Sequence, residues 1–264
     1  MSKRVLITGA AGGIGAAAAE RMRAAGARVV GIDLHEGEDI IACDVRDQAS
    51  VDRGVAEAIE RLGGGLDVLI NNAGVGDPQS AGAAPDEAAI ALLEVNLIAP
   101  WRVTSAALGA LRESRGRVVN VASGLAHLAV PFAPAYCMSK RGLVAYSDAL
   151  RLEHGDAITV TTVYPGYIRT AIHAKSQEQG FTLEGMVPAE PLKAAAKTLE
   201  RAALGRPTRD LATTRRGSVN YFLARRSPRA LLDRLTLAVV RRSARQGKFD
   251  DSQLAAEYAQ RLRA

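Results

Sequence analysis

The segment VLITGAAGGIGAA, residues 5–17, decides the fold, because an apolar strand-like run ends in a cluster of glycines that leads directly into an alanine-rich helix. Glycine permits a tight turn and a close approach of the backbone to a ligand, and the N-terminus of a helix favours negative charge. A turn of this kind holds the pyrophosphate of a dinucleotide. The alternative interpretation is a glycine-rich turn that serves packing alone.

The residues that follow repeat this unit, since short β-branched runs alternate with longer helical stretches. The alternation is typical of βαβ units and predicts an α/β fold, a Rossmann-type doubly wound parallel sheet with helices on both faces. The predicted strands are residues 5–8, 28–33, 39–42, 67–71, 117–123 and 159–164. The predicted helices are residues 15–25, 50–62, 85–112 and 135–153.

Charge and cysteine content exclude several classes of function. Residues 1–200 carry 19 Lys and Arg against 23 Asp and Glu, whereas residues 201–264 carry 15 against 5, so the net charge of +6 comes from the tail and does not indicate nucleic-acid binding. Cys43 and Cys137 lack neighbours at ligand spacing, so neither a metal site nor a disulfide is expected. With no signal peptide and no membrane-spanning segment, we expect a cytoplasmic protein.

Asp33 ends the second predicted strand, 18 residues after Gly15, where a carboxylate meets the ribose hydroxyls of a dinucleotide. Its charge would repel the 2′-phosphate of NADP, and the next three residues, 34–36, include no Arg or Lys to attract that phosphate. We therefore expect NAD as the cofactor in preference to NADP. The alternative is a solvated aspartate at the end of a strand.

Three further residues have the chemistry of a proton-transfer site. Tyr136 and Lys140 stand four apart and share one face of a predicted helix, and Ser123 closes the strand before it. A phenol is a poor base near neutral pH, and a nearby ammonium stabilises its phenolate. We expect Tyr136 to shuttle protons and Ser123 to donate a hydrogen bond to a substrate oxygen. The alternative interpretation, for each motif taken singly, is that Ser123 is an ordinary hydroxyl at the end of a strand. Tyr136 and Lys140 would then be an ordinary pair of residues on one helix face.

Together these motifs resemble the short-chain dehydrogenase/reductase family over residues 4–170. Gly9, Gly13 and Gly15 match its TGxxxGxG turn, residues 71–74 resemble its NNAG element, and Ser123 followed by residues 136–140 resembles its Ser and YxxxK signature. The resemblance implies hydride transfer between NAD(H) and a secondary alcohol or ketone.

The resemblance also implies roles for individual residues, including Asn96, which resembles the catalytic member that helps to hold the lysine. The catalytic residues would be Asn96, Ser123, Tyr136 and Lys140. The cofactor-binding residues would be Gly9, Gly12, Gly13, Ile14, Gly15, Asp33, Asp44, Val45, Asn72, Ala73, Gly74, Tyr136, Lys140, Pro165, Gly166, Ile168 and Thr170.

No linker divides the chain, so we predict one dinucleotide-binding and catalytic domain over residues 1–264. Residues 171–190 hold Gly and Pro among Phe181, Leu183, Met186 and Val187, which predicts a flap over an apolar pocket and favours a hydrophobic substrate. Residues 201–264 form a basic extension with nothing similar to the glycine-rich seventh strand of many family members. Its arginine-flanked apolar segment, residues 230–242, would form a helix packed on the domain or on a second subunit, or in peripheral contact with a membrane.

Two other functions remain open at this point. A regulatory or scaffold protein could bind NAD without turnover, but such a protein has no need of the catalytic set. An epimerase or dehydratase of the related extended group also uses a Tyr–Lys pair, but it usually has a longer chain and a different glycine spacing. Family members of the expected type form homo-oligomers, so a dimer or tetramer is expected.

Overall fold

The computed structural model describes residues 2–178, 189–252 and 254–263. Within these residues, seven strands pair in parallel as one sheet in the order β3-β2-β1-β4-β5-β6-β7, which confirms the predicted fold class. The strands are β1 (Arg4–Thr8), β2 (Arg28–Asp33), β3 (Ile40–Ala42), β4 (Val68–Asn71), β5 (Arg117–Val121), β6 (Thr159–Tyr164) and β7 (Asp210–Ala212). The helices are α1 (Gly13–Ala24), α2 (Gln48–Arg61), α3 (Glu87–Leu93), α4 (Ala99–Glu113), α5 (Pro134–His154), α6 (Ala174–Glu178), α7 (Leu192–Leu204), α8 (Arg215–Arg226), α9 (Arg229–Arg245) and α10 (Ala256–Arg263).

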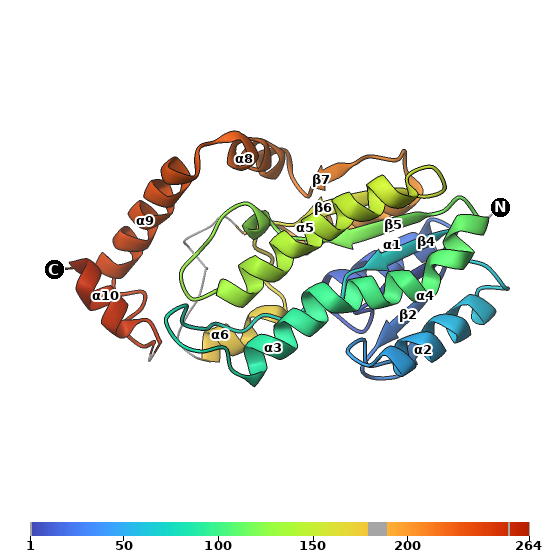
Figure 1. Cartoon of the computed structure of the whole chain (residues 1–264), viewed down its shortest axis with the longest axis horizontal. Helices are drawn as coiled ribbons and strands as arrows, with labels where there is room; N and C mark the ends of the chain where they lie inside the picture. The colour runs from blue at the N-terminus through green and yellow to red at the C-terminus, as the bar shows by residue number, and fades with distance from the viewer. Residues whose placement is uncertain (1, 179–188, 253, 264) are drawn as a thin grey trace.

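Helices cover both faces of the sheet (Figure 1). Successive residues of a strand point to opposite faces, so Leu6 and Leu69 pack against α2, α4 and α5, whereas Ile7 and Ile70 pack against α1 and α7. These strand side chains are fully buried. Two apolar cores therefore hold the sheet rigid, and the ends of its strands can position side chains accurately.

Residues 85–112 are helical over nearly the predicted range, but they do not form one regular α-helix. A π-helical segment, Glu94–Ile98, separates α3 from α4. Pro100 has no N–H to donate to the carbonyl of Asn96, four residues earlier, and its ring crowds that carbonyl. The helix widens there instead of continuing as a regular α-helix. π-helical bulges of this kind are frequent at functional sites.

A seventh strand is present that was not among the predicted strands, and it does not resemble a glycine-rich strand. β7 pairs with β6 from Thr162 to Tyr164, although it has only three residues and no glycine. Only Leu211 of this strand is buried, because β7 lies at the edge of the sheet. A strand this short leaves almost no alternating pattern in the sequence. The equally short β3 was predicted because it lies within the alternation of strands and helices, whereas β7 lies in the basic extension.

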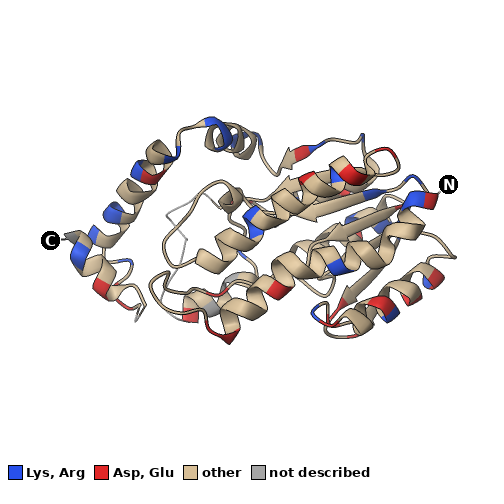
Figure 2. Ribbon diagram, in the orientation of Figure 1, with Lys and Arg blue, Asp and Glu red and all other residues tan. Residues whose placement is uncertain are grey.

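The basic extension begins later than expected, because residues 201–204 belong to α7 and residues 210–212 to β7. The arm, which we define as α8, α9 and α10, leaves the edge of the sheet after β7 and extends away from the body of the molecule (Figure 1). Lys and Arg recur along it (Figure 2). Its outer end packs back on the body through Phe132, whose ring centroid lies 5.5 Å from that of Tyr258.

Part of the predicted flap can be placed. Residues 171–178 form a 3-10 turn and α6, and residues 189 and 190 precede α7. The apolar residues on which the flap prediction rests, Phe181, Leu183, Met186 and Val187, lie outside the described residues. None of the helices in the described part of the chain combines the length and apolar character needed to cross a bilayer.

The turn after β1 has the backbone that its glycines allow. Gly9 and Gly13 have φ values of +68° and +54°, in the left-handed region that other residues rarely adopt. A Cβ atom on Gly15 would lie 2.0 Å from the carbonyl oxygen of Gly9, whereas a Cβ atom on Gly12 would have no neighbour within 4 Å. The backbone at Gly15 is therefore packed against Gly9 with no space for a side chain, whereas the backbone at Gly12 has free space beside it.

We predict that Gly15→Ala lowers the free energy of unfolding by about 3 kcal/mol, because the overlap is with backbone and cannot be relieved by a side chain. Gly12→Ala is the matched control, with an expected loss of about 0.5 kcal/mol or less. Urea denaturation followed by circular dichroism measures both. Equal stabilities of the two variants would contradict this account of the turn.

Candidate active site

A cavity of about 470 Å³ opens at the carboxyl edge of the sheet. Parallel strands bring their carboxyl ends to the same edge, and ligands of such folds bind there. The segments after β4, β5 and β6 all contribute lining residues, as do α5 and α8. Among the predicted site residues, the cavity is lined by Ile14, Asn72, Gly74, Ser123, Tyr136, Lys140, Pro165, Gly166, Ile168 and Thr170.

Ser123 and Tyr136 meet in this cavity. Ser123 follows β5 and caps a short 3-10 turn, where its hydroxyl accepts a hydrogen bond from the backbone N–H of Leu125 at 3.2 Å. Tyr136 stands in the first turn of α5, and its side chain lines the same cavity as that of Ser123. Burial raises the pKa of Tyr136 to about 12, and the Ser123 hydroxyl opposes this shift. The phenol is therefore protonated at neutral pH.

Lys140 lies one helical turn after Tyr136 and is almost fully buried. Its Nζ donates a hydrogen bond to the carbonyl oxygen of Val121 at 3.0 Å and lies 5.8 Å from the centroid of the Tyr136 ring. Burial lowers the pKa of Lys140 to about 8. Burial dominates the pKa of Tyr136, and the expectation that this lysine lowers the pKa of the phenol stays a prediction.

Asn96 lies in the π-helical segment and is fully buried. Its Oδ1 accepts from the N–H of Val75 and its Nδ2 donates to the carbonyl of Val75, both at 2.8 Å. A Cβ atom on Gly74 would lie 3.2 Å from Asn96 Oδ1 and 3.5 Å from Lys140 Nζ. Asn96 and Lys140 therefore flank the loop after β4, and the structure brings all four predicted catalytic residues to one side of the sheet.

Asn72 joins that loop to the glycine turn. Its Nδ2 donates to the carbonyl oxygens of Thr8 at 3.0 Å and Gly9 at 3.2 Å. The hydroxyl of Thr8 in turn accepts from the backbone N–H groups of Asn72 at 2.9 Å and Ala73 at 2.8 Å. The side chains of Asn72 and Thr8 thus make their hydrogen bonds within the protein. Asn72 and the backbone of Ala73 therefore support the glycine turn from the end of β4.

Asp33 lies beside the same turn at the end of β2. Its carboxylate accepts from the N–H of Ala11 at 2.9 Å and from that of Leu34 at 2.8 Å. Asp44 and Val45 follow the neighbouring strand β3; Val45 is buried, and Asp44 forms an ion pair with Arg46 at 2.7 Å that lowers its pKa. These three residues do not line the cavity, but they extend the same edge of the sheet away from Tyr136.

The loop after β6 faces the glycine turn across the cavity. Pro165, Gly166, Ile168 and Thr170 all line the cavity. A Cβ atom on Gly13 would lie 3.6 Å from Cγ2 of Thr170, so the two loops are in near contact. The sequence motifs for cofactor binding therefore converge although more than 150 residues separate them along the chain.

The residues present fit a dinucleotide. The N-terminus of α1 has Gly12 as its N-cap and no side chain that caps its first N–H groups, so these donors remain available to an anion. The first turn of α1 contains no acidic residue that would repel one. A Cβ atom at Gly12 would have no neighbour within 4 Å, so the backbone there is open to a pyrophosphate.

The residues that α8 brings to the cavity were not among the predicted site residues. Gly217, Asn220, Tyr221 and Ala224 line it from the arm, and Glu190 lines it from the segment before α7. Their spacing of three, four and seven residues marks one helix face and was a usable signal. The signal pointed to a helix that packs against something, but nothing in it identified the cavity as the partner.

Comparison with known proteins agrees with this arrangement. Residues 3–180 match the family described as short chain dehydrogenase. The chain is 32% identical over 216 residues to the 3-oxoacyl-(acyl-carrier-protein) reductase FabG of Escherichia coli strain K12, which covers 76% of this chain and 88% of that protein.

Two solved structures are similar in fold. A short chain dehydrogenase from Burkholderia cenocepacia in complex with NADP has a TM-score of 0.75 and 26% identity, covering 89% of this chain and 99% of that one. A 3-ketoacyl-(acyl-carrier-protein) reductase from Brucella melitensis complexed with NADH has a TM-score of 0.70 and 25% identity, covering 80% and 96%. Proteins of this fold thus occur with either nicotinamide cofactor.

We predict that Lys140→Met stabilises the folded chain by about 1–3 kcal/mol at pH 7, because it removes a buried ammonium whose pKa burial has lowered to about 8. In the wild type, the unfolded chain holds this proton up to about pH 10.5 and the folded chain only up to about pH 8, so wild-type stability rises with pH between these values.

The advantage of the variant should therefore shrink from pH 8 to pH 10.5 in denaturant titrations. Lys197→Met, at an exposed position on α7, is the control and should change stability little at any pH in this range. A Lys140→Met variant less stable than the wild type at pH 7 would show that burial of Lys140 carries no penalty.

Proposed function

The chain belongs to the short-chain dehydrogenase family, and on that premise we propose that it is an NAD-dependent oxidoreductase acting on a hydrophobic ketone and the corresponding secondary alcohol. The observation that carries the proposal is that Ser123, Tyr136 and Lys140 line one cavity with the glycine-turn residue Ile14 and the loop after β6. A proton donor and the proposed nicotinamide-binding loop thus share one cavity. Its mostly apolar lining supports a hydrophobic substrate.

Each residue has a distinct part in the proposed reaction. A bound nicotinamide supplies the hydride for reduction, or accepts it for oxidation. Ser123 orients the carbonyl oxygen by donating a hydrogen bond, and Tyr136 gives its phenolic proton to the same oxygen as the hydride arrives. Lys140 holds the ribose, and Asn96 keeps the loop beside Lys140 in place through Val75.

The protonation state of Tyr136 favours reduction at neutral pH. With its pKa raised to about 12, the phenol holds a proton that it can donate to an alkoxide, which is the stronger base. Oxidation of an alcohol requires the phenolate instead, so that direction should accelerate as pH rises. We therefore propose ketone reduction as the direction the site performs near pH 7.

Asp33 supports NAD over NADP. Its carboxylate stays beside the glycine turn because two backbone N–H groups hold it, and this is where the adenosine ribose would lie. A 2′-phosphate would meet this negative charge. Arg46, a nearby cation, is already paired with Asp44.

The proposed partners follow from the same premise. The substrate is a small molecule, and a homo-oligomer is expected for this family. Peripheral contact of the arm with a membrane stays a prediction, and flotation with anionic vesicles, with and without residues 228–264, tests it.

We predict that Tyr136→Phe lowers kcat for ketone reduction at least about 100-fold while the Kd of NADH stays nearly unchanged, because only the transferable proton is lost. Oxidation of NADH measured by absorbance gives the rate, and fluorescence titration gives the Kd. Tyr146→Phe is the matched control, since Tyr146 lies on α5 but stacks on Trp101 outside this cavity. Substantial activity in Tyr136→Phe would refute the assigned role.

We predict that Asp33→Asn raises the ratio of kcat/KM with NADPH to kcat/KM with NADH by about tenfold or more, because the repulsive charge is lost. The amide oxygen of Asn can still accept a hydrogen bond from Ala11, so the turn is retained. Both constants are measured with the same ketone. A wild-type chain that already prefers NADPH would overturn the cofactor assignment.

A further inference from the structure

The arm turns one face of α8 toward the cavity. Gly217, Asn220, Tyr221 and Ala224 line the cavity at the spacing of one helix face, and Arg216 in the first turn of α8 lines it as well. Phe222, the neighbour of Tyr221, is 51% exposed and stacks on the Arg226 guanidinium instead. Tyr221 is therefore the one large side chain among these four, with small residues one turn away on either side.

The N-terminal end of α8 is fastened by Glu190. This carboxylate accepts from the backbone N–H of Gly166 at 2.9 Å and from the hydroxyl of Thr214, the N-cap of α8, at 2.6 Å. The hydroxyl of Thr213 also donates to it. Glu190 thus links the start of α8 to the loop after β6, which carries the proposed nicotinamide site.

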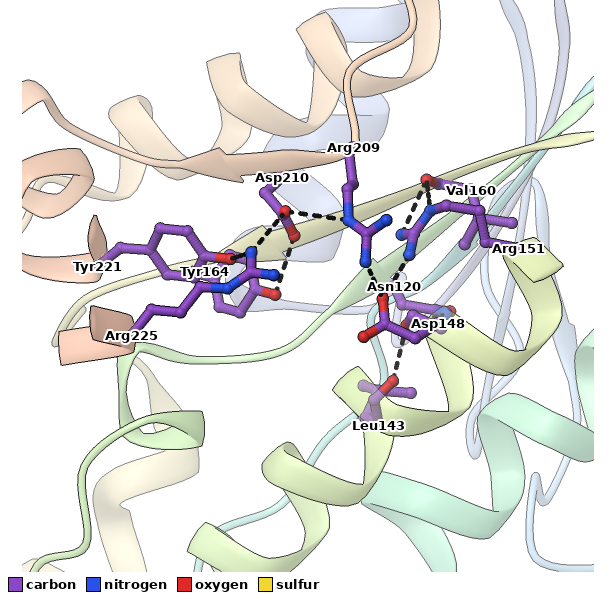
Figure 3. Close-up of polar contacts among 11 residues, drawn as sticks. Asn120, Leu143, Asp148, Arg151, Val160, Tyr164, Arg209, Asp210, Tyr221 and Arg225 are labelled. Atoms are coloured by element: carbon purple, nitrogen blue, oxygen red, sulfur yellow. Dashed lines mark hydrogen bonds and ion pairs between the residues drawn. The ribbon is translucent and has the colours of Figure 1, made fainter. Parts of the chain in front are cut away.

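The other end of α8 is fastened to the sheet by polar contacts around Asp210 (Figure 3). The hydroxyl of Tyr164 donates to Asp210 at 3.0 Å, and Arg225 pairs with the same carboxylate at 3.4 Å. Arg225 also donates to the Tyr221 hydroxyl at 3.1 Å. Tyr221 is therefore held at its hydroxyl as well as through its helix.

The ring of Tyr221 packs on other aromatic rings at the cavity wall. Its centroid lies 4.3 Å from that of Tyr164 and 5.0 Å from that of His127, the latter edge-on. Burial and neighbouring arginines lower the pKa of His127, so the imidazole is neutral at pH 7 and packs as an apolar ring. Tyr164 ends β6 directly before Pro165, so this aromatic wall is joined to the same loop.

We infer that α8 is a fixed wall of the substrate pocket and that Tyr221 determines specificity by limiting the size of the apolar group that can enter. This inference rests on the proposed function, and it names the substrate class as compact ring-bearing ketones. A ring can lie against the aromatic face of Tyr221, whereas the anchors at both ends of α8 oppose the outward shift that a larger group needs.

The test compares kcat/KM for a one-ring ketone, cyclohexanone, and a two-ring ketone, 2-decalone, with NADH. Tyr221→Ala should raise the ratio of 2-decalone to cyclohexanone about tenfold or more, because it removes the ring that excludes the second cycle. Tyr221→Phe retains the ring and should retain the wild-type ratio. Phe222→Ala removes a neighbouring exposed ring and should also leave the ratio unchanged.

The Kd of NADH should be the same in all four proteins, which separates a change in pocket size from a general loss of structure. An unchanged ratio in Tyr221→Ala, or an equal rise in Phe222→Ala, would overturn the inference. Neither outcome affects the role of Tyr136, which its own variant tests.

A binding measurement tests the wall without turnover. Tyr221→Trp places an indole at the cavity, and titration with cyclohexanone in the presence of NAD should change its emission. Phe222→Trp, whose indole faces solvent, should respond no more than the wild type, whose only tryptophan is Trp101. A silent Tyr221→Trp would overturn the inference, and a response in a chain that reduces no ketone would support the wall while rejecting the proposed function.

Discussion

Parallel pairing of the seven described strands is the constraint on which the site depends. Because every strand runs in the same direction, the turn after β1, the loop after β4, Ser123 after β5 and the loop after β6 all emerge at one edge. Residues distant in the chain are thereby brought together without any local sequence signal. The helices add what the strand ends cannot supply, since α5 carries both Tyr136 and Lys140 into the space above that edge.

The same region holds polar groups that an apolar protein interior disfavours. Lys140 is buried and donates a hydrogen bond to Val121. Asn120 is fully buried, accepts from the amide of Asn71 and donates to the hydroxyl of Ser147. Figure 3 shows Asn120 beside Leu143, whose carbonyl accepts from Ser147. These internal hydrogen bonds offset part of the cost of burial, although Oδ1 of Asn71 has no partner among the described residues. Burial of these polar groups beneath the cavity lowers the stability of the fold, and their hydrogen bonds fix the positions of the side chains.

The sequence predicts the sheet well because its strands leave periodic patterns, and its motifs predict which side chains meet in the cavity. The strands β1 to β6 and the spacing from Ser123 to Lys140 belong to this class. Features that depend on tertiary contact were missed or mistaken. The π-helical segment depends on the missing N–H of Pro100 opposite the carbonyl of Asn96, and β7 lies outside the alternation of strands and helices within which the equally short β3 was predicted. The raised pKa of Tyr136 follows from burial, which no motif encodes. The proposed role of α8 was hidden for the same reason, since the spacing of its cavity-lining residues gives no indication of which surface they meet.

The most direct test of the account is a crystal structure of the chain with NADH bound. The account predicts the pyrophosphate on the N-terminal amides of α1 and the nicotinamide beside Thr170. It also predicts the Tyr136 hydroxyl within about 3 Å of the Ser123 hydroxyl and facing the nicotinamide ring. A dinucleotide bound elsewhere, or a Tyr136 hydroxyl turned away from Ser123 and the ring, would contradict it.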